Sequence, residues 1–92
     1  MNRLEQARVT INEVDKEIAA LFERRMKAVE DVIIYKIEND MPIFDSSREK
    51  QVIEKNSAYI TEEKYVESYK KFIQMMMDIS KEYQAEIISK KK

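Results

Sequence analysis

Three cationic side chains interrupt an apolar helical pattern in the N-terminal part of this sequence. Arg8, Arg25 and Lys36 occupy positions at which a seven-residue repeat otherwise places apolar side chains. An inward-facing cation is costly unless an anionic group meets it. Arginine presents forked donors to a carboxylate, and lysine presents a compact positive charge. These side chains therefore predict a binding site for a small anion, with ion pairs inside the protein as the alternative.

The charges along this segment are sorted by face. The repeat has three rows, namely Leu4, Ile11, Ile18, Arg25 and Val32; Ala7, Val14, Leu21, Ala28 and Tyr35; and Arg8, Asp15, Phe22, Val29 and Lys36. These rows carry three cations and one acid, whereas the remaining positions between 3 and 39 carry four bases and seven acids. A structural ion pair with Asp15 can neutralise one inward cation, but this helix alone cannot neutralise all three.

A second polar group lies near the C-terminus. Ser80 and Gln84 are four residues apart, so they share one face of a helix. Gln84 is neutral and its amide donates hydrogen bonds at any pH. The pair is interpreted as a ligand contact, although a polar pair that sets the register of a helix bundle is an alternative.

A third polar group begins the middle segment of the chain. Asp45, Arg48 and Glu49 lie within one helical turn and could face the same ligand. Ser46-x-x-Glu49 also fits a capping box, in which Glu49 only closes the start of a helix. Asp45 is an alternative N-cap. Capping and ligand binding need not exclude each other.

Composition limits the chemistry that these groups can perform. The 92 residues suit a single domain spanning 1–92, with no Cys, no His and a net charge of -1. A thiol nucleophile, a disulfide framework and the usual neutral-pH general base are therefore excluded, and no metal or cofactor is expected. The net charge argues against nucleic acid as a partner. Without a membrane-spanning run or a signal-peptide core, a cytoplasmic protein with no membrane partner is expected.

The elements that must position these side chains are three helices, so the predicted fold class is all-α. A long helix is expected over 4–39, a short one from 45 to 57, and a third from Thr61 as N-cap to about Ser89. The first would be about 54 Å long, too long for a compact domain whose radius of gyration is about 12 Å. We therefore predict an intertwined helical homodimer, with a break of the first helix near 24–27 as the alternative.

The full series of polar residues resembles one enzyme family. The pattern is Arg8-x-x-Ile11-x-x-x-Asp15, Arg25, Val32-x-x-x-Lys36, Pro42-x-x-Asp45-x-x-Arg48-Glu49 and Ser80-x-x-x-Gln84. This order and spacing resemble the all-helical (AroQ-type) chorismate mutases over nearly the whole chain. The resemblance implies a Claisen rearrangement of chorismate to prephenate in the biosynthesis of Phe and Tyr. It also implies a homodimer with shared active sites and no cofactor.

The same resemblance implies a role for each residue of the site. The catalytic set would be Arg25, Lys36, Gln84 and Glu49, and the substrate-binding set would be Arg8 from the partner chain, Asp45, Arg48 and Ser80. Arg25 and Arg8 would hold the two carboxylates, and Ser80 would contact a carboxylate. Lys36 and Gln84 would bond the ether oxygen whose C–O bond breaks. Glu49 and the Asp45 backbone would receive the ring hydroxyl, with Arg48 in support. Asp15 would be structural.

Two other functions remain open at this point. An isochorismate pyruvate-lyase on the same scaffold would share the cations and Gln84, but Asp45-x-x-Arg48-Glu49 and Ser80 favour the mutase. A non-catalytic helical dimerisation module has no reason to keep such cations on inward faces. Because no nucleophile or proton-shuttling base is evident, the expected enzyme works by conformational restraint and electrostatic stabilisation.

Overall fold

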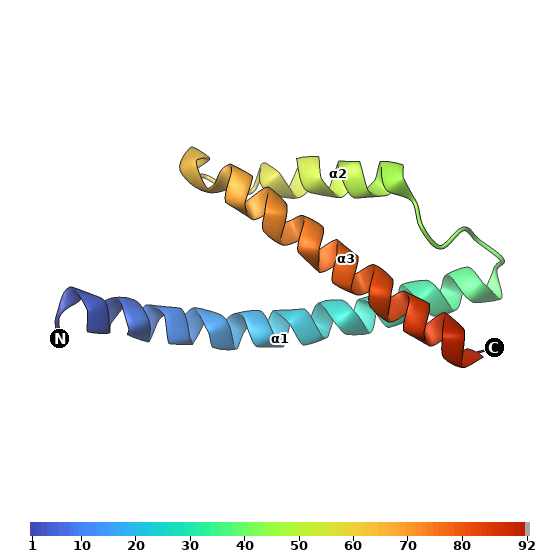
Figure 1. The fold of residues 1–92 in the computed structure, drawn as a ribbon, viewed down its shortest axis with the longest axis horizontal. Coiled ribbons are helices and arrows are strands. Elements are labelled where there is room, and N and C mark those ends of the chain that lie inside the picture. Colours follow the sequence, from blue (N-terminus) through green and yellow to red (C-terminus); the bar gives the residue numbers. More distant parts are fainter. Residues whose placement is uncertain (92) are drawn as a thin grey trace.

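The computed structural model describes residues 1–91, which form three α-helices and one short 3-10 helix without a strand. Helix α1 spans Arg3–Glu38, α2 spans Ser46–Ser57, the 3-10 helix η1 spans Glu63–Tyr65 and α3 spans Val66–Lys91. Helix α3 packs against both α1 and α2, and Figure 1 shows it running diagonally from the end of α2 to the C-terminal half of α1. The all-α prediction of a long, a short and a long helix is confirmed. Lys92, the last residue of the expected domain, lies outside the described residues.

Helix α1 is unbroken along its whole length. Asn2 caps its start, because the Asn2 side-chain oxygen accepts a hydrogen bond from the Glu5 N–H at 2.8 Å. The alternative of a break near 24–27 is wrong, since that segment is helical throughout. The 36 residues of α1 account for a length of about 54 Å. The longest dimension of the chain is correspondingly 55 Å.

A left-handed turn closes the C-terminus of α1. Asp40 has a φ of 51°. The Met41 N–H donates to the Lys36 carbonyl at 2.8 Å, and the Asp40 N–H donates to the Ile37 carbonyl at 3.3 Å. These two bonds form a Schellman motif with an aspartate at the position where glycine is usual. Pro42 follows, and the chain turns from α1 towards the start of α2 (Figure 1).

The start of α2 separates the two capping alternatives. Asp45 is the N-cap, because its Oδ1 accepts bonds from the Ser47 N–H at 3.1 Å and the Arg48 N–H at 3.2 Å. The capping-box interpretation is wrong, since Ser46 is already the first helical residue. Glu49 therefore does not cap α2, and its carboxylate contacts Lys81 of α3 instead.

Helix α3 starts differently from the prediction. Thr61 is not its N-cap: the chain enters through η1, whose own N-cap, Glu62, makes no side-chain bond. Within α3, Ile73, Met77 and Ser80 are buried. The half-buried residues of α3 include Val66, Tyr69, Met76, Tyr83, Gln84 and Ile87, whereas Phe72 is exposed. The same face therefore packs against both other helices.

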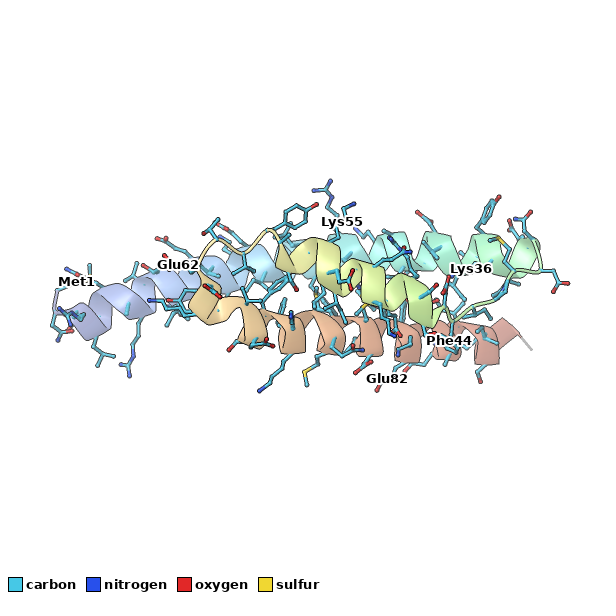
Figure 2. All side chains as sticks on the ribbon, turned by 90° about the horizontal axis from the view of Figure 1, so that it is seen from above. Met1, Lys36, Phe44, Lys55, Glu62 and Glu82 are labelled. Atoms are coloured by element: carbon cyan, nitrogen blue, oxygen red, sulfur yellow. The ribbon has the colours of Figure 1, made fainter. Side chains whose placement is uncertain are left out.

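Most of the apolar stripe of α1 is uncovered in the single chain. Ile33 is fully buried against the rest of the protein, although it lies outside the three predicted rows. By contrast, Ile18 is 44% exposed and Leu21 is 58% exposed. Figure 2 shows the Met1 end of α1 extending past the turn at Glu62. The radius of gyration is 16.7 Å, well above the value of about 12 Å for a compact domain of this size.

Candidate active site

A cavity of about 220 Å³ lies where the C-terminal half of α1, the start of α2 and α3 meet. It contains seven of the eight side chains singled out in the sequence: Arg25, Lys36, Asp45, Arg48, Glu49, Ser80 and Gln84. Apolar side chains complete its wall, namely Val29, Val32, Ile43, Phe44, Val52 and Met77. The fold thus brings together polar groups that come from three separate parts of the chain.

The guanidinium of Arg25 is held from the opposite helix. Its Nη1 donates to Ser80 Oγ at 2.6 Å, and Ser80 Oγ donates its own proton to the Met76 carbonyl at 2.9 Å. Ser80 is only 5% exposed. A short bond from a charged donor to a buried, already oriented hydroxyl restricts the guanidinium strongly. Arg25 therefore presents its remaining donors to the cavity in a defined direction.

Lys36 lies at the last turn of α1 and contacts the segment that leaves it. Its Nζ donates to the Ile43 carbonyl at 3.2 Å. The Schellman turn makes this contact possible, because it directs residues 41–45 back past the end of the helix. The ammonium has further donors that this bond leaves free. Lys36 is half-buried, so its charge is partly removed from solvent.

The Asp45 carboxylate is occupied by capping. Besides the two N–H groups, its Oδ1 accepts a bond from Ser47 Oγ at 2.6 Å. The hydrogen bond from the Ser47 side chain, followed by that from the Arg48 N–H, lowers the pKa of Asp45 below its ordinary value. Its side chain is therefore a fixed anion at the cavity rim, while Arg48 beside it is exposed.

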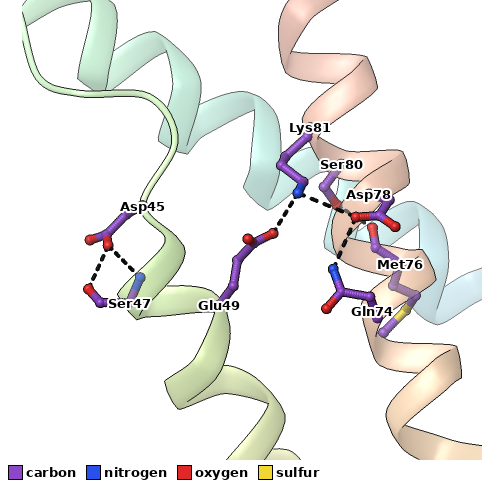
Figure 3. Close-up of polar contacts among 8 residues, drawn as sticks. All are labelled: Asp45, Ser47, Glu49, Gln74, Met76, Asp78, Ser80 and Lys81. Atoms are coloured by element: carbon purple, nitrogen blue, oxygen red, sulfur yellow. Dashed lines mark hydrogen bonds and ion pairs between the residues drawn. The ribbon is translucent and has the colours of Figure 1, made fainter.

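Lys81 lines the cavity and was not anticipated from the sequence. Its Nζ lies 2.8 Å from Glu49 Oε1 on α2 and 3.3 Å from Asp78 Oδ1 on α3, as Figure 3 shows. The hydrogen bond that the Lys81 ammonium donates to the Glu49 carboxylate is the main cause that raises the pKa of Lys81. One signal was present, because Lys81 is three residues from Gln84 and four from Met77, and such residues share a helical face.

Of the two remaining predicted residues, Gln84 lines the cavity and Arg8 does not. Gln84 is half-buried, and its Oε1 has no hydrogen-bond partner among the described residues. Arg8 is exposed and is the one candidate that does not line the cavity. It precedes Arg25 on the same unbroken helix by roughly 26 Å, which is too far for it to reach the cavity of its own chain.

The charges around the cavity favour a dianion. Four cationic side chains and two carboxylates line it, which leaves a net charge of +2. The bonds already described fix the directions of Arg25, Lys36 and Glu49. Such a site can bind two carboxylates and a hydroxyl, and it can present cationic and amide donors to an oxygen that becomes negative.

A second hollow of about 590 Å³ shares Arg25 with the polar cavity. Its lining is mostly apolar and consists of Asp15, Ile18, Ala19, Leu21, Phe22, Arg25, Phe72, Met76 and Ile79. It joins the exposed stripe of α1 to the exposed Phe72 side chain of α3. Arg25 is shared by both hollows, so the cation of the polar cavity also borders this apolar surface.

Comparison with known proteins assigns a family to this arrangement. Across residues 1–91, every helix is too short or too polar to span a bilayer. No curated protein and no solved structure gave a match. The family model described as chorismate mutase type II, the AroQ class, matches residues 7–85, a range that contains all eight candidate residues. Because this match covers most of the chain, the protein belongs to the type II chorismate mutase family.

Proposed function

We propose that this protein catalyses the rearrangement of chorismate to prephenate. The observation that carries this proposal is the single cavity that gathers Arg25, Lys36, Glu49 and Gln84, with a net charge suited to a dianion. The reaction breaks one C–O bond and forms one C–C bond within the substrate, so it needs no nucleophile and no proton transfer. A site that restrains the substrate and stabilises charge is sufficient for such a step.

We assign the roles of the cationic and amide groups from the family resemblance and from their common place in the cavity. Arg25, oriented by Ser80, binds one carboxylate of the substrate. Lys36 and Gln84 direct N–H donors at the ether oxygen, where negative charge grows as the C–O bond breaks. The interaction is stronger in the transition state than in the ground state, so it lowers the barrier. Loss of one such donor costs about 100-fold or more in turnover.

The remaining groups hold the ring of the substrate. Glu49 accepts the hydrogen bond of the ring hydroxyl, and the Asp45 backbone lies beside it at the start of α2. The Asp45 Oδ1 is occupied by capping, and we assign the contact with the ligand to the Asp45 main chain. Arg48 adds positive charge at the open rim. The apolar wall, which includes Val32, favours the compact conformer of the substrate over the extended one.

We also propose that the working unit is a homodimer in which each site takes Arg8 from the other chain. The exposed apolar rows of α1 and the hollow around Leu21 need a cover, and a second α1 lying antiparallel supplies one. The same arrangement brings the Arg8 end of one helix to the Arg25 half of the other. The cytoplasmic location stays a prediction from the sequence.

The reaction is tested directly by following chorismate. We expect loss of its ultraviolet absorbance, with prephenate as the product. Purified protein that leaves chorismate unchanged at high enzyme concentration would refute the proposal. Release of pyruvate from isochorismate would identify the lyase instead. A Lys36→Ala variant is expected to lose about 100-fold or more in kcat, which ties the activity to this cavity.

Sharing of the site is tested by mixing two inactive variants. Arg8→Ala and Arg25→Ala are each expected to be severely impaired. If each site draws these two residues from different chains, a mixed dimer has one unaltered site and one doubly altered site. Random pairing then restores about a quarter of wild-type activity. If both residues came from one chain, no mixed dimer would contain an unaltered site, and the mixture would stay inactive.

A further inference from the structure

We propose that Lys81 is a positioning residue of this site, which holds the Glu49 carboxylate in place and cancels its charge towards the substrate. The inference rests on the proposed function and deepens it, because it concerns how a site with a carboxylate in its wall can bind a substrate that is itself a dianion. Lys81 acts through Glu49 and is not proposed to touch the reacting atoms.

The geometry of the pair supports this role. Lys81 Nζ reaches across from α3 to Glu49 Oε1 on α2 at 2.8 Å, and Asp78 Oδ1 holds the same ammonium from behind at 3.3 Å (Figure 3). The side chains of Lys81 and Glu49 are 36% and 27% exposed, and both line the cavity. Glu49 is therefore fixed by a contact from another helix rather than by its own.

Charge balance gives this contact a function beyond joining two helices. The cavity carries Arg25 and Lys36 from α1 and Arg48 from α2, against Asp45 and Glu49. Without Lys81 the net charge of the lining falls from +2 to +1, and Glu49 faces the dianion unpaired. A hydroxyl acceptor in such a site needs a neighbouring cation, or its charge repels the substrate that it must bind.

A purely structural ion pair is the competing explanation, and a double-mutant cycle separates the two. The variants are Lys81→Met, Glu49→Gln and the double variant, measured for kcat, KM and binding of prephenate to the full-length protein. Lys81→Gln takes the place of Lys81→Met if helical circular dichroism is lost. Lys70→Met is the matched control, because Lys70 lies on α3, pairs with Glu67 three residues earlier, and does not line the cavity.

We expect Lys81→Met to raise KM and the prephenate Kd by about tenfold, because the Glu49 carboxylate then loses the cation that holds it and stands unpaired beside the dianion. In the Glu49→Gln background the same change should cost less than about threefold, because no carboxylate remains to be held or neutralised. Lys81→Arg should recover most of the loss. Lys70→Met should match the wild type.

The outcomes distinguish this inference from the proposed function. Wild-type protein that neither converts chorismate nor binds prephenate overturns both. An active wild type in which Lys81→Met changes KM by less than twofold overturns the role of Lys81 alone. An equal loss with and without the Glu49 carboxylate also overturns it, since Lys81 would then act independently of Glu49.

Discussion

Replacing Ser80 by alanine tests whether α3 orients the key guanidinium of α1. The change removes the acceptor of the 2.6 Å bond from Arg25 Nη1 and leaves the helix intact, because the Met76 carbonyl is also an acceptor within the α3 backbone. A hydrogen bond to a charged group contributes about 1.5–3 kcal/mol. Arg25 is half-buried and keeps some access to water, so the lower end of that range applies. About 1.4 kcal/mol corresponds to a tenfold loss in rate.

We therefore expect Ser80→Ala to lower kcat/KM for chorismate about tenfold with only a modest fall in the denaturant midpoint, since the higher helix propensity of alanine offsets part of the lost bond. The assay is the disappearance of chorismate, compared with urea unfolding of the same samples. Ser68→Ala is the matched control, because Ser68 is an exposed serine on the same helix. A kcat/KM within twofold of wild type would refute the positioning of Arg25, and a large loss of stability would show that the hydroxyl mainly supports the fold.

Three further predictions concern the donor to the ether oxygen, a hydrogen bond whose strength depends on pH, and the exposed apolar stripe of α1. Gln84→Glu should be active only at acidic pH, where its carboxyl can still donate, and equal activity at neutral pH would contradict the role of Gln84. Tyr83 donates to Glu30 Oε1 at 2.6 Å, and this bond raises the pKa of Tyr83 above 10.0. Its stabilisation is therefore present below pH 10 and is lost as pH rises through the raised pKa, so Tyr83→Phe should lower the unfolding midpoint at neutral pH but not at strongly alkaline pH. Leu21→Asp should give monomers in light scattering with loss of activity, because Leu21 is 58% exposed on the predicted interface.

The order of the helices was predictable because local signals decide it. Pro42 and the residues before it end the first helix, and Asp45 begins the second in one of the two ways foreseen. The predicted start of the third helix was wrong, because Thr61 could cap the helix only if the chain entered it directly. A 3-10 turn comes first, and its cap position belongs to Glu62, which makes no side-chain bond.

The grouping of the polar residues was predictable from spacing, whereas their partners were not. The contact of Ser80 with the ligand stays a prediction, whereas its bonds with Arg25 and the Met76 carbonyl were not foreseen. Lys81 was missed because its spacing from Met77 and Gln84 indicates a shared helical face but does not show that this face meets Glu49 where α3 crosses α2. Burial of Ile33 was missed as well, since Ile33 lies outside the three heptad rows although the rest of the chain covers it fully.

The unbroken course of α1 has a consequence for which sequence changes this protein can tolerate. In the proposed dimer, Arg8 and Arg25 serve two different sites while belonging to one stiff element. Each inserted residue between them would turn Arg8 by about 100° and displace it by about 1.5 Å. A single insertion would therefore point the Arg8 cation of each site away from its substrate while leaving the other residues of both sites untouched. The helix fixes the distance and the rotation between Arg8 and Arg25, so the number of residues between these arginines is constrained as well as their chemical identity.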